Sequence, residues 1–120
     1  MDSYLIREGN ITLEYYVEGS EQNTLVCFHG HGRQVEDFLF LAKKDRKLLL
    51  IVLPHHGKSR FPLERIENQP LKIEEFNSIF TKILEKEAIN HFHFIGFSQG
   101  GRFVLSLLTL YNDRLKSVQV

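Results

Sequence analysis

The sequence contains only one cysteine, Cys27, so the chain cannot form an internal disulfide and fits a reducing compartment. It lacks an excess of either charge: Lys and Arg total 15, and so do Asp and Glu, whereas nucleic-acid and membrane-surface binders usually carry a basic excess. The longest apolar run, Leu48–Leu53, is too short to span a bilayer. The first residues, Met1–Arg7, lack the basic and apolar regions of a signal peptide. These absences predict a cytoplasmic protein with neither a nucleic-acid partner nor a membrane partner.

What is present is ordinary for a globular domain. The 120 residues are 42% hydrophobic and 25% charged, without an internal repeat, a low-complexity segment or a linker. We therefore expect residues 1–120 to form one domain or part of one.

Two kinds of apolar pattern alternate along the chain. Continuous apolar runs are typical of strands that are covered on both faces, and apolar residues three and four apart are typical of helices. The strands are expected at Tyr4–Arg7, Ile11–Val17, Thr24–Phe28, Lys47–Leu53, His91–Phe97 and Leu115–Val120, and the helices at Val35–Lys44, Ile73–Lys86 and Gly100–Tyr111. This order predicts an α/β fold: a mostly parallel sheet with an N-terminal antiparallel hairpin and helices on both faces.

The motif that carries chemistry is Gly-Phe-Ser-Gln-Gly at residues 96–100, which matches G-x-S-x-G. It lies between an expected strand and an expected helix, where a sharp turn would present the hydroxyl of Ser98 as a nucleophile. Gly96 and Gly100 leave room where a Cβ would clash. The N–H of Gln99, at the start of the helix, is expected to be one donor of an oxyanion hole.

A second turn, Phe-His-Gly-His-Gly at residues 28–32, follows the first buried strand. Gly30 lets the main chain bend close to a substrate, and the N–H of His31 is expected to be the other oxyanion donor. His29 is a candidate for substrate binding.

Together these motifs resemble those of the α/β-hydrolase superfamily. His29-Gly30 is similar to its HG oxyanion motif, residues 54–59 to its D-x-P-G-x-G-x-S loop and residues 96–100 to its nucleophile elbow. Val52 stands where the family has aspartate, and His55 where it has glycine. The resemblance implies the α/β-hydrolase fold, residues 1–120 being the N-terminal portion of its core domain. It also implies a serine hydrolase acting on small esters, thioesters or related carbonyl compounds.

Two alternatives stay open. Gly100-Gly101-Arg102 is similar to the SHCHC synthase branch of the superfamily, a menaquinone-pathway carbon–carbon lyase, and there the matching arginine would bind a carboxylated substrate. A non-catalytic relative that uses the fold for binding is the other alternative. The family's triad runs Ser, then Asp or Glu after a later strand, then His near the C-terminus, and no residue of these 120 can be carried over as its acid or base. We therefore expect the chain as given to turn over little or nothing.

Other sites are disfavoured. His29, His31, His55 and His56 follow neighbouring strands and could hold zinc, but no carboxylate or cysteine accompanies them at ligand spacing. Gly57-Lys58-Ser59 lacks the first glycine of a phosphate-binding loop, and the turn at residues 30–32 lacks the third glycine of a dinucleotide site. The sequence predicts a small-molecule substrate, no metal and no cofactor.

Overall fold

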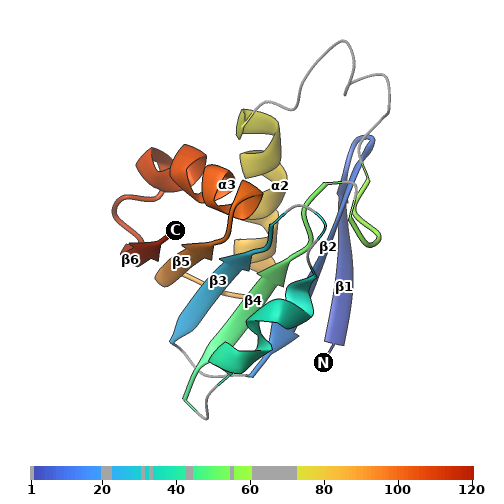
Figure 1. The fold of residues 1–120 in the computed structure, drawn as a ribbon. Coiled ribbons are helices and arrows are strands. Elements are labelled where there is room, and N and C mark those ends of the chain that lie inside the picture. Colours follow the sequence, from blue (N-terminus) through green and yellow to red (C-terminus); the bar gives the residue numbers. More distant parts are fainter. Residues whose placement is uncertain are drawn as a thin grey trace.

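The computed structural model describes residues 2–19, 23–30, 32, 34–42, 45–54, 56–60 and 73–120. Within these residues, one sheet of six strands has the order β1-β2-β4-β3-β5-β6, shown in Figure 1. The strands are β1 (Asp2–Glu8), β2 (Ile11–Glu18), β3 (Thr24–Phe28), β4 (Lys47–Ile51), β5 (Phe92–Gly96) and β6 (Leu115–Gln119). The helices are the 3-10 helix η1 (Val35–Leu41), α2 (Ile73–Lys86), α3 (Gln99–Leu107) and the short 3-10 helix η2 (Leu108–Leu110).

The strand directions confirm the predicted fold class. β1 and β2 form an antiparallel hairpin, whose turn contains Gly9 at a φ of 59°. β2 is antiparallel to β4, and β3 is parallel to both β4 and β5. β6 is parallel to β5. Phe28 is in register with both Ile51 and Gly96, so the carboxyl ends of β3, β4 and β5 lie level at one edge of the sheet.

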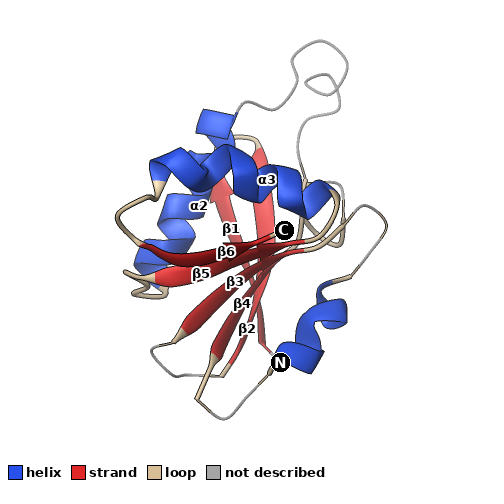
Figure 2. Cartoon of the chain, turned by 60° about the vertical axis from the view of Figure 1, so that its left-hand side comes forward, coloured by secondary structure: helices blue, strands red, loops and turns tan. Residues whose placement is uncertain are grey.

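Both faces of the sheet are covered, as the continuous apolar strands predicted. Helices α2 and α3 lie on one face and η1 lies on the other (Figure 2). Leu49 and Ile51 of β4 belong to the cluster under α2 and α3, whereas Leu48 and Leu50 belong to the smaller cluster under η1. This alternation explains why β4 has no polar side chain after Lys47.

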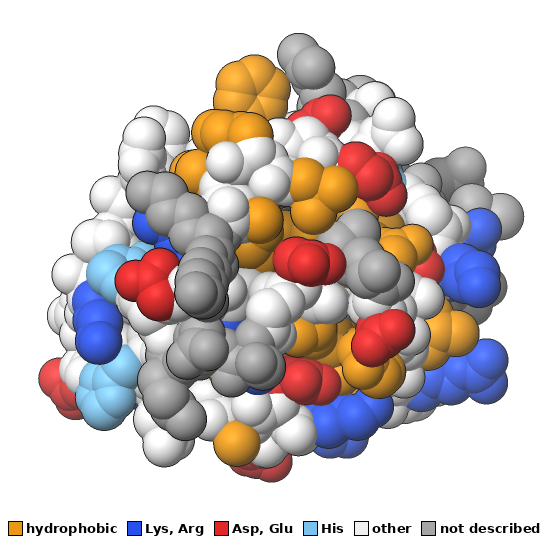
Figure 3. All heavy atoms as spheres, turned by 90° about the horizontal axis from the view of Figure 1, so that it is seen from below, with side chains coloured by type: hydrophobic (Ala, Val, Ile, Leu, Met, Phe, Trp, Pro, Cys, Tyr) orange, Lys and Arg blue, Asp and Glu red, His pale blue; other side chains and the backbone are white. Residues whose placement is uncertain are grey.

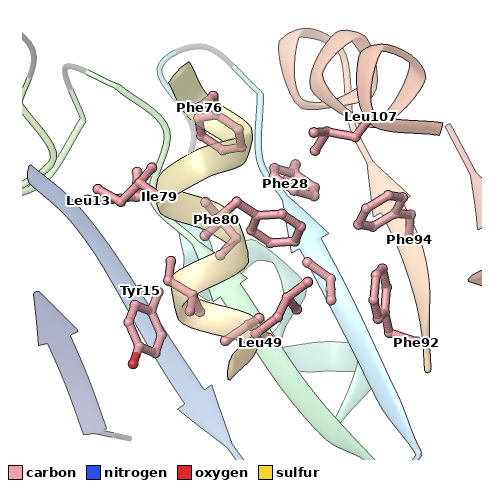
Figure 4. Close-up of a cluster of buried hydrophobic side chains, with 14 of the residues drawn as sticks. Leu13, Tyr15, Phe28, Leu49, Phe76, Ile79, Phe80, Phe92, Phe94 and Leu107 are labelled. Carbon is pink, nitrogen blue, oxygen red and sulfur yellow. The ribbon is translucent and has the colours of Figure 1, made fainter. Parts of the chain in front are cut away.

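Aromatic rings dominate the larger cluster (Figure 4). The ring of Phe28, at the end of β3, lies 5.8 Å from that of Phe80, 5.6 Å from that of Phe94 and 6.3 Å from that of Phe103, measured between centroids. These partners come from α2, β5 and α3. Each such aromatic pair adds about 0.5–1.5 kcal/mol of stability to that gained from burying its apolar area. The pairs therefore hold the end of β3 against α3.

Two predicted helices differ from the structure. The helix expected over residues 35–44 is a 3-10 helix that ends at Leu41, since Ala42 has extended backbone. A repeat of three residues per turn places Val35, Phe38 and Leu41 on one face, and all three pack in the cluster under η1. Lys43 and Lys44 lie outside the described residues.

The helix expected over residues 100–111 is α3 followed by η2. It is apolar nearly all round in sequence, but only one face is buried, and Leu105 is 55% exposed because α3 is an outer layer over β3 and β5.

The surface at the end of the molecule where β3 and β4 begin carries charges of both signs. Acidic and basic side chains both surround apolar ones there (Figure 3).

Candidate active site

Ser98 lies in a sharp turn between strand and helix. β5 ends at Gly96 and α3 begins at Gln99. Ser98 has a φ of 56° and a ψ of −113°, a combination that residues with a Cβ rarely adopt, and its side chain is exposed. Such strain costs on the order of 1–3 kcal/mol and persists only where the surrounding structure enforces it. The strained turn therefore depends on contacts made by its neighbours.

Those contacts are close approaches of main chain to main chain. A Cβ on Gly96 would lie 2.6 Å from the carbonyl oxygen of Gly100. A Cβ on Gly100 would collide with the carbonyl oxygens of Phe28 and His29 at the end of β3. The N–H of Phe97 donates to the oxygen of Phe28 at 3.1 Å, which ties the turn to β3. Only glycine at positions 96 and 100 allows this packing.

Gln99 places a main-chain donor beside Ser98. As the first residue of α3, its N–H has no acceptor within the helix, and it lies at the positive end of the helix dipole. The side-chain oxygen Oε1 of Gln99 is buried and has no hydrogen-bond partner among the described residues. Gln99 is therefore the first residue of a helix, which is where the sequence predicts the first oxyanion donor.

The turn after β3 is organised by His29, which is 1% exposed. Its Nε2 accepts the N–H of Leu53 at 2.9 Å, so its Nδ1 carries the proton and donates to the oxygen of Gly30 at 2.7 Å. Burial is the main cause that lowers the pKa of His29, and the nearby His56 lowers it further. Both ring nitrogens of His29 therefore form hydrogen bonds with main-chain groups. His31, the predicted second oxyanion donor, lies outside the described residues.

The loop after β4 is held by polar groups that sequence reasoning missed. Glu14 of β2 is 4% exposed, and its Oε1 accepts the N–H of Lys58 at 2.9 Å. Ser59 is fully buried; its Oγ accepts the N–H of Glu14 at 2.9 Å and donates to the oxygen of Val52 at 2.7 Å. Glu14 thus brings a carboxylate to the loop in which Val52 replaces the family's aspartate. The available signal was an acid in the middle of a mostly apolar strand.

His56 links the same loop to the turn after β3. Its Nε2 accepts the N–H of Gly32 at 3.0 Å, and its Nδ1 lies 3.1 Å from the oxygen of Pro54. The rings of His29 and His56 meet edge to face, 4.7 Å between centroids. Within the described residues, no three His, Cys, Asp or Glu side chains are grouped to hold a metal ion. His55 lies outside those residues.

A cavity of about 420 Å³ opens between the turn after β3 and the turn before Ser98. Most of its walls are apolar, and Asp37 is the one acidic side chain among its described lining residues. The lining consists of His29, Gly30, Asp37, Phe38, Phe40, Ile95, Gly96, Phe97, Gln119 and Val120. The structure therefore brings together His29, Gly30 and Gly96 of the predicted site. Arg102 is exposed on α3, and like Ser98, Gln99 and Gly100 it is not among the residues that line this cavity.

Comparison with known proteins identifies the architecture. The profile of the family described as alpha/beta hydrolase fold matches residues 23–119. No curated protein matches the chain. Within the described part of the chain, no helix is long and apolar enough to cross a membrane.

Several solved structures resemble the chain. An alpha/beta hydrolase from Novosphingobium aromaticivorans is 18% identical, with a TM-score of 0.77 over 98% of this chain and 43% of that one. A hydrolase from Pseudomonas aeruginosa is 17% identical, with a TM-score of 0.78 over 98% of this chain and 44% of that one. The thioesterase domain from the curacin biosynthetic pathway is 17% identical, with a TM-score of 0.80 over 100% of this chain and 46% of that one. The chain thus spans less than half the length of these structures.

Proposed function

The chain belongs to the alpha/beta hydrolase fold family, and from that premise we propose that its protein is a serine hydrolase with Ser98 as the nucleophile. The observation that carries the proposal is the turn itself: an exposed serine at a φ of 56°, between a strand and a helix that begins at the next residue. The two glycines let α3 pack closely on β3 and β5, but that packing does not itself require a strained, exposed serine between them. Such a serine is what a nucleophile elbow requires.

In the proposed reaction the Oγ of Ser98 attacks a carbonyl carbon, and the carbonyl oxygen becomes an oxyanion. The N–H of Gln99 stabilises that charge from the start of α3, and the N–H of His31 is proposed as the second donor. The serine gives up its proton to a general base, which later returns it to the leaving alcohol or thiol. Water then hydrolyses the acyl-enzyme, and Ser98 is regenerated.

The general base is proposed to come from elsewhere in the protein. Among the described histidines, the ring nitrogens of His29 and His56 already contact main chain. The Nδ1 of His93 is hydrogen-bonded to Ser117 at 2.5 Å. His91 precedes β5, whereas Ser98 follows it, so the strand's five residues separate them by about 13 Å or more. None of these four is placed to take the proton of Ser98.

The cavity next to the elbow supports the proposed substrate class. Its volume of about 420 Å³ and its apolar walls, which include Phe38, Phe40 and Phe97, suit the uncharged acyl part of a small ester or thioester. A carboxylated substrate, as in the lyase alternative, would meet the like charge of the Asp37 carboxylate there. The site therefore favours hydrolysis of neutral acyl groups.

Labelling with a fluorophosphonate probe tests the nucleophile. The full-length protein is incubated with the probe and analysed by mass spectrometry of its peptides, beside Ser98→Ala and Ser106→Ala. Ser106 is the matched control, since it is exposed on the same helix and has no part in the turn. We expect the wild type and Ser106→Ala to be labelled on Ser98, and Ser98→Ala to lose all labelling. An unlabelled wild type would contradict the proposal and favour a non-catalytic relative.

A further inference from the structure

Two hydrogen bonds run in opposite directions between the turn after β3 and the loop after β4. His29, in the turn, accepts the N–H of Leu53 from the loop after β4 at 2.9 Å. His56, in the loop, accepts the N–H of Gly32 from the turn at 3.0 Å. The two imidazole rings pack edge to face between these bonds. We name this reciprocal pair the histidine clasp.

We propose that His56 is a positioning residue, which fixes the turn after β3, where the second oxyanion donor is proposed, by accepting the N–H of Gly32. The inference rests on the proposed function, because it assigns a role in that reaction. Gly32 has a φ of 71°, in the region that favours glycine, so its own backbone preferences do not select a single conformation. The bond to His56 gives the chain a fixed point at this residue.

The hydrogen-bond roles within the clasp follow from the groups that face each ring. A main-chain N–H can only donate and a carbonyl oxygen can only accept, so in both rings Nε2 is the acceptor and Nδ1 carries the proton. The donor from Nδ1 goes to Gly30 in one ring and to Pro54 in the other, and this fixes each tautomer. Two neutral rings in this arrangement hold four main-chain groups of two loops.

The loop that carries His56 is itself anchored, so the clasp has a firm base. Glu14 accepts the N–H of Lys58, two residues after His56, at 2.9 Å. The fully buried Ser59 joins β2 to the end of β4 through both of its hydrogen bonds. A chain of contacts thus runs from the sheet through the loop and His56 to Gly32. An arrangement of this kind limits how far the turn can move during the reaction.

Two substitutions at one position separate positioning from mere packing. His56→Gln keeps a carbonyl oxygen near the place of Nε2, so it can still accept the N–H of Gly32. His56→Leu keeps a similar volume but removes the acceptor. Both variants are made in the full-length protein, and circular dichroism checks that they fold. Steady-state hydrolysis of an activated p-nitrophenyl ester then gives kcat and KM for each.

We expect His56→Leu to lower kcat by about 10- to 100-fold while KM changes less than about threefold, since losing an oxyanion donor outright costs about 100- to 1,000-fold. His56→Gln should recover kcat to within about threefold of the wild type. Equal losses in both variants, an unchanged kcat in His56→Leu, or a loss confined to KM would each overturn the inference.

Hydrogen exchange of the Gly32 amide gives a readout that needs no activity. The amide should be protected in the wild type and in His56→Gln, and exchange at least about tenfold faster in His56→Leu. A fast-exchanging amide in the wild type would overturn the clasp itself. If the probe fails to label Ser98 while the Gly32 amide is protected, the proposed function fails and the role in catalysis falls with it, but the hydrogen bond stands.

Discussion

The packing of α3 on the end of β3 can be tested with two adjacent glycines. Gly100 and Gly101 are both buried and both lie in the first turn of α3. A Cβ on Gly101 would meet nothing closer than the Cβ of Val120 at 3.6 Å, an ordinary contact. A Cβ on Gly100 would lie 2.5 Å from the oxygen of His29 and nearer still to that of Phe28. The same substitution at neighbouring positions thus meets opposite surroundings.

The expected magnitudes follow from these distances. At Gly100 the Cβ would be about 0.5 Å closer to the oxygen of His29 than the 3.0 Å that real Cβ contacts keep, and closer still to that of Phe28. These neighbours are main-chain atoms at the end of a strand. Forced overpacking of this kind costs about 1–3 kcal/mol or more, and α3 must move away from β3 to relieve it. At Gly101 the change gains the helix propensity of alanine, about 0.5–1 kcal/mol. We expect the two variants to differ in free energy of unfolding by about 3 kcal/mol.

The assay is urea denaturation of the two alanine variants and the wild type, followed by circular dichroism at 222 nm because the chain has no tryptophan. Gly100→Ala should also reduce fluorophosphonate labelling of Ser98, since moving α3 shifts the N–H of Gln99. If Gly100→Ala proved as stable as Gly101→Ala, the close approach of α3 to β3 described above would be wrong.

Three further outcomes are expected. Ser59→Ala should lower the free energy of unfolding by about 2 kcal/mol, because it leaves two buried main-chain groups unpaired, whereas the exposed Ser106→Ala should change it by less than about 0.5 kcal/mol in the same urea titration. Because burial lowers the pKa of His29, the unfolded chain takes up the proton first. The stability that His29 contributes is therefore present above pH about 6.5 and is lost below it, at up to about 1.4 kcal/mol per pH unit. As the pH is lowered, the urea midpoint of unfolding should fall more steeply in the wild type than in His29→Gln. Burial also raises the pKa of the Cys27 thiol, which is 1% exposed, so it should react with a thiol reagent only after denaturation; prompt reaction of the native protein would contradict its placement in the core.

Most of the fold could be predicted from the sequence because the apolar pattern of a strand or helix matches the layer of the fold in which it lies. Continuous apolar runs placed β3 at its observed bounds, and the three- and four-residue spacing did the same for α2. The pattern could not give the length of η1, because Val35, Phe38 and Leu41 fit a repeat of three as well as one of 3.6. It also could not give the burial of α3, since apolar residues on all sides do not say how many layers surround a helix.

The site was predictable where main-chain geometry dictates the residue type. Glycines at 96 and 100 around a serine indicate a sharp turn, and the structure has that turn. The supporting contacts were not predictable, because they join residues that are distant in the chain. The carboxylate of Glu14 reaches an N–H 44 positions away, and each bond of the histidine clasp spans 24. Such pairings depend on strand order, which local patterns do not encode.

Two residues other than glycine share the same backbone torsion for different reasons. Ala88, in the turn after α2, and Ser98 both have a φ of 56°. Glycine at either position would relieve the strain, so Ala88→Gly and Ser98→Gly should both make the protein easier to produce and harder to unfold. A library sorted only for yield would therefore accept both replacements equally and would lose the hydroxyl of the proposed nucleophile. Sorting on yield together with probe labelling would retain the first and reject the second.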